Sequence, residues 1–277
     1  MVGRTAQCEE MTPAIELRGV TKRFLTPSGA VFIALRDLNM TVESGEFCAV
    51  VGPTGCGKST TLALISGLEP ASDGEVQVDA RPVNGIIDGI GYVFQSDAVF
   101  PWKTVLENVA AGPRYHGVST REARDRAREW IARVGLAGFE DRYPYQLSGG
   151  MRKRVALAQS LINGPRILLM DEPFSALDVQ TRNLMENELL GLWSGSRTTV
   201  VFVTHDLEEA ISLSDRVFVI TAGPGTVKSN YKVDLPRPRN VAEIRFQPKF
   251  SQIYEEIWND LRDEVLVSYE RQKRGAA

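Results

Sequence analysis

The sequence is poor in cysteine and in long apolar runs, and it carries almost no net charge. Its three cysteines, Cys8, Cys48 and Cys56, form an odd and unpatterned set, which is typical of reduced thiols rather than of a disulfide framework. The N-terminus lacks the apolar centre of a signal peptide, so we expect no export. The longest apolar runs, FCAVV and ILLM among them, fall far short of the roughly 18 residues that a membrane-spanning helix needs. If the protein works at a membrane, another subunit must cross it.

The balance of charges argues against nucleic acid as a partner. Lysine and arginine total 32 and aspartate and glutamate total 35, which gives a formal net charge of −3 and a pI near 5.6. Because no sequence-wide basic footprint is present, nucleic acid is not an expected partner. The 43% hydrophobic and 24% charged content is ordinary for a globular protein, and 277 residues suit one large domain or two modest ones.

Four short apolar runs rich in β-branched residues predict buried parallel strands. They are residues 47–51, 166–170, 199–203 and 216–220. Because helical patterns lie between them, we expect an α/β fold around a mainly parallel sheet. The segment 14–42 alternates polar and apolar residues around a PSG turn, which predicts an antiparallel β piece at the edge of that sheet.

From about residue 106 to 146 the pattern becomes helical, which predicts a helical subdomain inserted into the core at about 96–160. Its clearest element starts where Ser119 and Glu122 have the spacing of a capping box. The apolar residues that follow recur at helical intervals; they are Ala123, Ala127, Trp130, Ile131 and Val134. The arginines between them alternate with acidic residues, which indicates a solvated face with ion pairs rather than a nucleic-acid surface.

The last part of the chain predicts a terminal helix. The stretch LPRPR, residues 235–239, breaks regular structure, and an apolar stripe spaced by four residues follows it. The stripe consists of Ile253, Ile257, Leu261 and Val265. We expect it to pack on the chain's own domain.

The stretch GPTGCGKST, residues 52–60, matches the phosphate-loop pattern G-x-x-x-x-G-K-[ST] between a strand and a helix, which is the context this motif requires. Glycines let the backbone N–H groups point at phosphate oxygens, and the helix that begins near Lys58 adds the positive end of its dipole. Lys58 can then reach the β- and γ-phosphates, and the Ser59 hydroxyl can ligate Mg²⁺. Alone, the loop leaves kinases, GTPases and ATPases open.

Cys56 lies inside this loop. The amide dipoles of the loop favour a thiolate there. We expect Cys56 to be a bystander in the chemistry, with the hypothesis that its alkylation would block nucleotide binding.

Two further stretches help to decide among kinases, GTPases and ATPases. In RILLMDEP, Asp171 lies at the carboxyl end of a strand, where it can hold the hydration shell of Mg²⁺. Glu172 can orient or deprotonate an attacking water. In QLSGGMRKR, Ser148, Gly149 and Gly150 lead into a helix whose free N–H groups can bind a second anion.

With these motifs in order, the chain resembles the nucleotide-binding subunit of ATP-binding cassette (ABC) transporters from Ile15 to about Gly225. The motifs are GPTGCGKST, YVFQ with Gln95, LSGGM, ILLMDEP, SALD (175–178) and THD with His205. At Met151 the chain departs from the family, which usually has glutamine there. The N–H and hydroxyl groups expected to bind the anion precede this position. The resemblance implies a P-loop NTPase core, an ABC ATPase domain over 14–230, a flexible N-terminus over 1–13 and a C-terminal extension with an amphipathic helix over 231–277.

The resemblance also implies ATP and Mg²⁺ as cofactors, and it assigns roles to residues. Phe24 matches the aromatic position that stacks on adenine, Gln95 the residue that senses Mg²⁺ and the attacking water, and His205 the histidine that contacts the γ-phosphate. The expected nucleotide-binding set is Phe24, Gly52, Pro53, Thr54, Gly55, Cys56, Gly57, Lys58, Ser59, Thr60, Ser148, Gly149, Gly150 and Asp178. The expected catalytic residues are Glu172, His205, Gln95 and Lys58, and the expected metal ligands are Ser59, Gln95 and Asp171.

In this family the signature residues contact the ATP held by a partner's phosphate loop, so we expect a second copy of the chain and two ATP molecules sandwiched between the copies. Asp178 would cross that interface. ATP then joins the copies, and hydrolysis separates them.

The segments FPWKTVLENV, HDLEEAISLSDRVFVI, AGPG and LPRPR resemble the importer branch that serves nitrate, sulfonates and taurine. This implies integral-membrane permease subunits as partners and, indirectly, an external solute-binding protein, with the chain at the cytoplasmic face of the inner membrane. Phe100, Pro101 and Trp102 match the region that docks the permease. The alternative for Trp102 is packing inside the helical subdomain. The competing class is a soluble ABC-type ATPase acting on nucleic acid or ribosomes.

Overall fold

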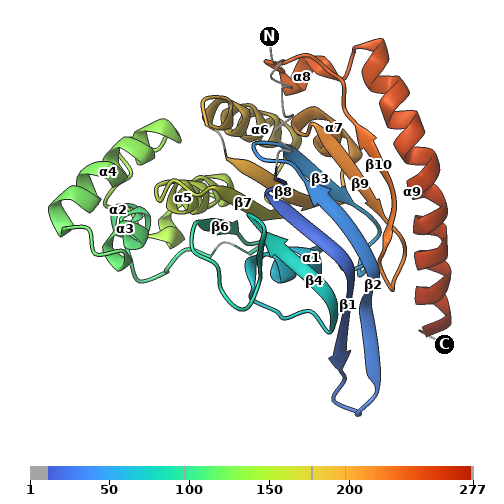
Figure 1. Ribbon diagram of the computed structural model, residues 1–277. Helices are drawn as coiled ribbons and strands as arrows, with labels where there is room; N and C mark the ends of the chain where they lie inside the picture. The colour runs from blue at the N-terminus through green and yellow to red at the C-terminus, as the bar shows by residue number, and fades with distance from the viewer. Residues whose placement is uncertain (1–11, 97, 176, 197, 276–277) are drawn as a thin grey trace, which may run out of the picture.

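The computed structural model describes residues 12–275 except 97, 176 and 197, so the predicted flexible N-terminus lies almost entirely outside the described residues. The central sheet has six strands in the order β10-β9-β3-β8-β7-β6 (Figure 1). Its strands are β3 (Phe47–Val51), β6 (Ile90–Val93), β7 (Ile167–Asp171), β8 (Thr199–Thr204), β9 (Arg216–Ile220) and β10 (Val227–Lys232). All pairs are parallel except β10 on β9, which confirms the four predicted strands and the mainly parallel sheet.

A second sheet is antiparallel and has the order β2-β1-β4-β5. Its strands are β1 (Ile15–Leu25), β2 (Val31–Val42), β4 (Asp73–Val78) and β5 (Arg81–Pro82). The predicted antiparallel piece is therefore confirmed, but it forms a sheet of its own with β4 and β5 instead of extending an edge. Alternate side chains of this sheet, such as Ile15, Leu17 and Leu38, are buried in the core. The sheet therefore packs with one face on the core instead of pairing with an edge strand.

Alternate residues of the central strands enter two different cores. Phe47, Ala49 and Val51 of β3 face α6 (Val179–Ser194), α7 (Leu207–Leu213) and the C-terminal helices. Cys48 and Val50 face α1 (Lys58–Ser66) and the antiparallel sheet. Since both faces of the sheet are covered, its inner strands β3, β7, β8 and β9 are continuous apolar runs.

The helical subdomain has its own core (Figure 1, green). Its elements are α2 (Val105–Val109), α3 (Ala111–Tyr115), α4 (Thr120–Arg133), the 3₁₀ turn Pro144–Gln146 and α5 (Gly149–Leu161). Ser119 caps α4 as predicted, with its hydroxyl accepting a hydrogen bond from the Glu122 N–H at 3.3 Å. Arg126 pairs with Glu122 and Arg128 with Asp125 on the exposed face, which confirms the predicted helical ion pairs.

The chain ends in α8 (Val241–Ile244) and α9 (Pro248–Gly275), and α9 runs along the side of the molecule next to β9 and β10, away from the helical subdomain (Figure 1). Ile253, Ile257 and Leu261 are buried against the core as predicted, but Val265 is 40% exposed, so the stripe ends one turn early. Within the described part of the chain, no helix combines the length and the apolarity that crossing a membrane requires.

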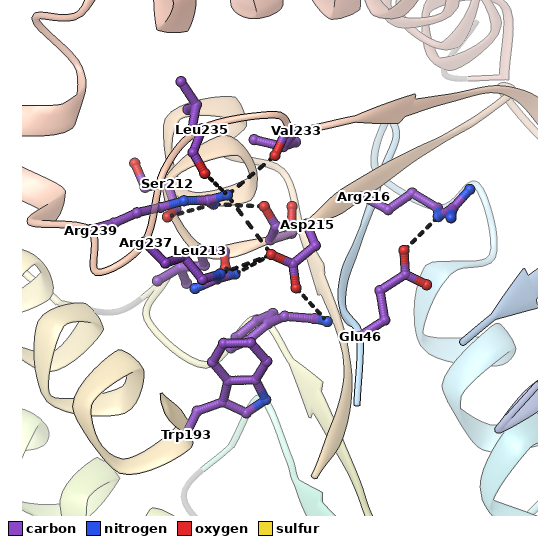
Figure 2. Close-up of polar contacts among 12 residues, drawn as sticks. Glu46, Trp193, Ser212, Leu213, Asp215, Arg216, Val233, Leu235, Arg237 and Arg239 are labelled. Carbon is purple, nitrogen blue, oxygen red and sulfur yellow. Dashed lines mark hydrogen bonds and ion pairs between the residues drawn. The ribbon is translucent and has the colours of Figure 1, made fainter. Parts of the chain in front are cut away.

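The LPRPR stretch fastens this C-terminal segment to the core (Figure 2). The Arg239 guanidinium is buried and donates to five backbone carbonyl oxygens; these belong to Ile211, Ser212, Ser214, Val233 and Leu235. Arg237 donates to the Asp215 carboxylate at 2.7 Å and lies 4.4 Å from the centre of the Trp193 ring. Asp215 in turn accepts a hydrogen bond from the Phe47 N–H, at the start of the central strand β3. Three segments therefore meet at one charged cluster.

Candidate functional site

Four neighbouring strands bring the candidate residues to one edge of the central sheet. The order β3-β8-β7-β6 places their carboxyl ends side by side. The phosphate loop follows β3, His205 follows β8, Glu172 follows β7, and Gln95 comes two residues after β6. Open α/β sheets bind their ligands at this edge.

The phosphate loop curls around its own lysine. The Lys58 ammonium donates to the carbonyl oxygens of Gly52 and Pro53, at 2.8 and 3.0 Å. Gly57 has a φ of 103°, and a Cβ atom there would lie 2.5 Å from the Leu35 Cδ2 atom of β2, so a side chain does not fit. The other expected contacts of this loop are exposed or half-buried; they are Thr54, Gly55 and Thr60.

Ser59 and Asp171 form a pair of oxygen ligands. The Ser59 hydroxyl donates to Asp171 Oδ1 at 3.1 Å, although the two residues are 112 positions apart. Burial raises the pKa of Asp171, and the hydrogen bond from Ser59 partly opposes that rise. Within the described residues no cluster of three or more histidine, cysteine, aspartate or glutamate side chains could hold a metal. The oxygen pair fits Mg²⁺, which takes one or two protein ligands and completes its shell with phosphates and water.

Glu172 lies between two further candidates. Its carboxylate accepts a hydrogen bond from the Gln95 amide at 3.1 Å, and the other carboxylate oxygen lies 3.3 Å from His205 Nδ1. The backbone of Glu172 has a φ of 43°, in the left-handed region that favours glycine. Such strain is found chiefly at functional sites, and it costs of the order of 1–3 kcal/mol. Its N–H is held by the Val203 carbonyl oxygen at 3.0 Å.

The signature stretch forms the start of α5. Ser148 is the N-cap, and its hydroxyl accepts a hydrogen bond from the Met151 N–H at 3.3 Å. Ser148 and Gly149 are exposed, so the amide end of the helix faces outward, where an anion is favoured. A Cβ atom on Gly150 would lie 3.0 Å from the Thr181 Cγ2 atom, so this helix start packs on the first turn of α6.

Two expected nucleotide-binding residues belong to other elements. Asp178 is exposed and caps α6, accepting a hydrogen bond from the Thr181 N–H at 3.0 Å, which lowers its pKa. Phe24 lies half-buried on β1 opposite Phe32, with the Lys22 ammonium 4.8 Å from its ring centre. The nucleotide roles of Asp178 and Phe24 stay predictions.

The expectation of a thiolate at Cys56 is wrong. Its side chain is 1% exposed, and burial raises the pKa of the thiol above its usual value. The Lys58 charge and hydrogen bonds from loop N–H groups lower that pKa, but the effect of burial is larger. Cys56 is therefore a buried thiol and not a reactive thiolate.

Sequence reasoning missed a lysine that supports the site. Lys153 of α5 is 5% exposed, and its ammonium donates to the Gln95 carbonyl oxygen at 2.5 Å. The basic run MRKR after the signature glycines was the available signal, but it does not tell which of its side chains turns inward.

The helical subdomain also presents an aromatic surface. Trp102 is 71% exposed, so the alternative in which it packs inside the subdomain is wrong. It lines a groove of about 390 Å³ together with Lys103, Arg114 and Tyr115. The Lys103 ammonium lies 4.5 Å from the centre of the half-buried Phe100 ring.

Comparison with known proteins agrees with these motifs. The family described as ABC transporter matches residues 35–175. An uncharacterised ABC transporter ATP-binding protein of Methanocaldococcus jannaschii is 46% identical over 94% of this chain and 96% of its own length. The nitrate import ATP-binding protein of a Synechocystis strain is 41% identical, with 90% and 95% covered. An aliphatic sulfonates import ATP-binding protein of Bacillus cereus is 39% identical, with 93% and 96% covered.

A solved structure is also similar. It is an ATP-binding cassette in a dimeric post-hydrolysis state bound to ADP and Pi, 34% identical to this chain, with a TM-score of 0.72 over 80% of this chain and 100% of that one. Taken with the strand order and the phosphate loop, these comparisons place the chain in the ABC transporter family, as one of its ATP-hydrolysing cassettes that bind ATP with Mg²⁺.

Proposed function

We propose that this chain is the ATP-hydrolysing subunit of an importer for a small anion such as nitrate, a sulfonate or taurine. It works as a peripheral protein at the cytoplasmic face of the inner membrane, with separate permease subunits and, indirectly, an external solute-binding protein. Support for the solute class comes from the nitrate and sulfonate import relatives, which match nearly the whole chain.

The observation that carries the proposed chemistry is the arrangement around Glu172. Because Gln95 and His205 both contact its carboxylate, Glu172 is held where it can take a proton from a water that attacks the γ-phosphate. Lys58 exchanges its bonds to the loop carbonyls for bonds to the β- and γ-phosphates. His205 contacts the γ-phosphate.

Ser59, Asp171 and Gln95 are the residues that would hold Mg²⁺. When bound, the ion neutralises charge on the phosphate oxygens. The loop residues 52–60 cradle the phosphates through their N–H groups, and Phe24 stacks on the adenine.

The second half of each site comes from a second copy of the chain. The outward-facing start of α5 carries Ser148 and Gly149 with the positive end of a helix dipole, which suits a γ-phosphate held by the other copy. Asp178 is also exposed, as the N-cap of α6, and we assign it to the same interface. The dimeric cassette that resembles this chain supports a twofold arrangement.

The test is the variant Glu172→Gln, which keeps the side-chain shape and removes the base. We expect turnover to fall by at least about 100-fold while ATP still binds, and the ATP-bound dimer to accumulate. Radiolabelled ATP binding and light scattering after gel filtration measure both. Glu208→Gln is the matched control, since Glu208 lies outside the group around Glu172 and pairs with Arg245 instead; it should retain turnover.

Retention of most of the turnover in Glu172→Gln would overturn the assignment of the base. The solute class has a separate test. Vesicles that hold the chain with its permease and binding protein should hydrolyse ATP faster with nitrate, an aliphatic sulfonate or taurine outside. Stimulation by DNA or RNA in place of these solutes, with no membrane association, would contradict the importer function.

A further inference from the structure

Arg182 in the first turn of α6 joins two segments that are distant in the sequence. Its Nη1 atom donates to Asp206 Oδ2 at 2.7 Å, and its Nη2 atom donates to the Leu177 carbonyl oxygen at 3.3 Å. A planar guanidinium can serve both acceptors at once, whereas a lysine ammonium offers a point charge without this fixed fork. Arg182 is only partly accessible, with 25% of its side chain exposed.

The Asp206 end of this bridge lies directly beside the histidine of the site. Asp206 follows His205 in the chain and is the N-cap of α7, where Oδ1 accepts hydrogen bonds from the N–H groups of Glu208 and Glu209. One carboxylate oxygen therefore starts α7 and the other is held by Arg182. Because His205 has no regular secondary structure of its own, its position depends on β8 before it and on Asp206 after it.

The Leu177 end lies beside the residue proposed to reach the second copy. Leu177 immediately precedes Asp178, and it is buried whereas Asp178 is exposed. The same segment is tied to the base, since the Ser175 hydroxyl donates to the Glu172 carbonyl oxygen at 3.0 Å. Ser175 is thus tied to the base, and Leu177 is tied to Arg182.

We infer that Arg182 is a positioning residue for ATP hydrolysis: it holds His205 and the Asp178 segment in one fixed arrangement, so that the contact with the second copy and the γ-phosphate contact are made together. This inference rests on the proposed roles of His205 and Asp178. Arg182 touches neither reacting atoms nor, in this arrangement, the base; it acts through Asp206 and Leu177.

Arg245 provides a matched comparison for a purely electrostatic role of Arg182, because it lies in the same charged region. Four acidic residues gather around α7, and two arginines face them; the acids are Glu186, Asp206, Glu208 and Glu209, and the arginines are Arg182 and Arg245. Arg245 of the α8 C-cap pairs with Glu208 at 3.1 Å and donates to Asn183, so it offers charge to the same acids. The hydrogen bonds that define the bridge, to Asp206 and to Leu177, come from Arg182.

The experiment compares Arg182→Lys and Arg182→Met with the control Arg245→Met in the full chain. We expect both Arg182 variants to lose roughly tenfold or more in kcat, to bind Mg-ATP within about twofold of the parent, and to lose cooperativity in ATP, with a Hill coefficient near 1. Arg245→Met should keep kcat within about twofold. Circular dichroism reports whether each variant folds, and Arg182→Lys keeps the buried charge if Arg182→Met does not fold.

A second measurement tests whether Arg182 acts through Asp206. Asp206→Asn keeps an oxygen that can cap α7 but loses the ion pair with Arg182. If the two residues act as one unit, the double variant Arg182→Lys/Asp206→Asn should lose little more kcat than either single variant. Full additivity of the two losses would contradict the bridge.

Full kcat and cooperativity in Arg182→Lys would overturn the inference, and so would an equal loss in Arg245→Met, because charge alone would then explain the effect. These outcomes are separable from failure of the proposed function. If Glu172→Gln abolishes turnover while Arg182→Lys does not, the hydrolysis assignment stands and the positioning role is rejected.

Discussion

Glu172 shows how a single residue can be fixed by its backbone and its side chain together. Its left-handed φ of 43° is unfavourable for a glutamate by roughly 1–3 kcal/mol. The conformation is retained because the N–H bonds to Val203 and the carboxylate is held by Gln95 and His205. A glutamine at this position inherits the same backbone, so Glu172→Gln changes the chemistry with little change in geometry.

Cys56 yields a prediction with a defined pH dependence. Because burial raises the pKa of its thiol, the thiolate fraction at pH 7 to 8 is smaller than in an unfolded chain. We expect iodoacetamide to modify Cys56 in the native protein at least about tenfold more slowly than in urea. The native rate should still climb at alkaline pH after the unfolded rate has levelled off, since the raised pKa lies above the ordinary value of about 8.5.

Peptide mapping by mass spectrometry measures each cysteine separately. Cys48 is the internal control, because it is also fully buried and its pKa is also raised, mainly by burial. Protein that is modified at Cys56 should no longer bind ATP, since the Cys56 sulfur lies 2.7 Å from where a Cβ atom on Gly52 would be and leaves no room for an adduct. Equal rates at Cys56 in native and unfolded protein at pH 7 would refute the buried thiol.

At the scale of single residues, the sequence alone predicts those site residues that belong to contiguous motifs. Ser59 and Asp171 were identified from separate motifs, and the structure joins them by a hydrogen bond. Lys153 and Arg182 could not be predicted, because their partners Gln95 and Asp206 lie 58 and 24 positions away and depend on how helices pack on the sheet. The burial of Cys56 likewise depends on β2 and on the loop before β10, which surround the phosphate loop.

Among the elements, the C-terminal segment is fastened through Arg239. The last carbonyl groups of α7 have no partner within the helix, and Arg239 satisfies two of them with a positive charge at the helix end. Burial lowers the pKa of Arg239 to about 10, so the residue is still charged at neutral pH. Helix α7 is thus capped by Asp206 at its start and by the LPRPR stretch at its end (Figure 2).

Arg239→Ala tests this fastening. The change leaves several buried carbonyl groups without a donor, so we expect the free energy of unfolding to fall by about 2–3 kcal/mol. Equilibrium urea unfolding, followed by circular dichroism, measures the loss. Arg237→Ala is the comparison, because Arg237 donates to only one backbone carbonyl oxygen, that of Leu213, besides the Asp215 carboxylate, and its side chain is 27% exposed; we expect a smaller loss of about 1–1.5 kcal/mol. Equal losses in the two variants would show that burial of Arg239 does not matter.

Elements with strong patterns were predictable and weak ones were not. The four apolar runs became β3, β7, β8 and β9 because strands covered on both faces are continuously apolar. Strand β6, IGYV, is only four residues long and contains a glycine, and β10, VKSNYK, is an edge strand with mostly polar residues. Neither carries a signal of its own, since each is specified by pairing with a neighbouring strand.

In the whole molecule, the sheet edge with the candidate site, the C-terminal helix and the helical subdomain form three separate surfaces. The nucleotide edge lies at the carboxyl ends of the central strands, the C-terminal helix covers β9 and β10, and the helical subdomain lies on the opposite side from that helix (Figure 1). Trp102 is on the subdomain and outside the group around Glu172, so the proposed docking surface and the proposed hydrolysis site can be tested independently.

Trp102→Ala should leave the isolated ATPase unchanged within about twofold, because a side chain that is 71% exposed contributes little to folding. Loss of an aromatic anchor typically costs about 2 kcal/mol of binding, so affinity for permease-containing membrane vesicles should fall roughly 30-fold. Vesicle cosedimentation measures this. Phe246→Ala is the matched control, since Phe246 is 81% exposed after α8, outside the subdomain, and its loss should leave membrane binding intact. If Trp102→Ala lowers the free energy of unfolding but keeps membrane affinity, the docking surface lies elsewhere on the subdomain.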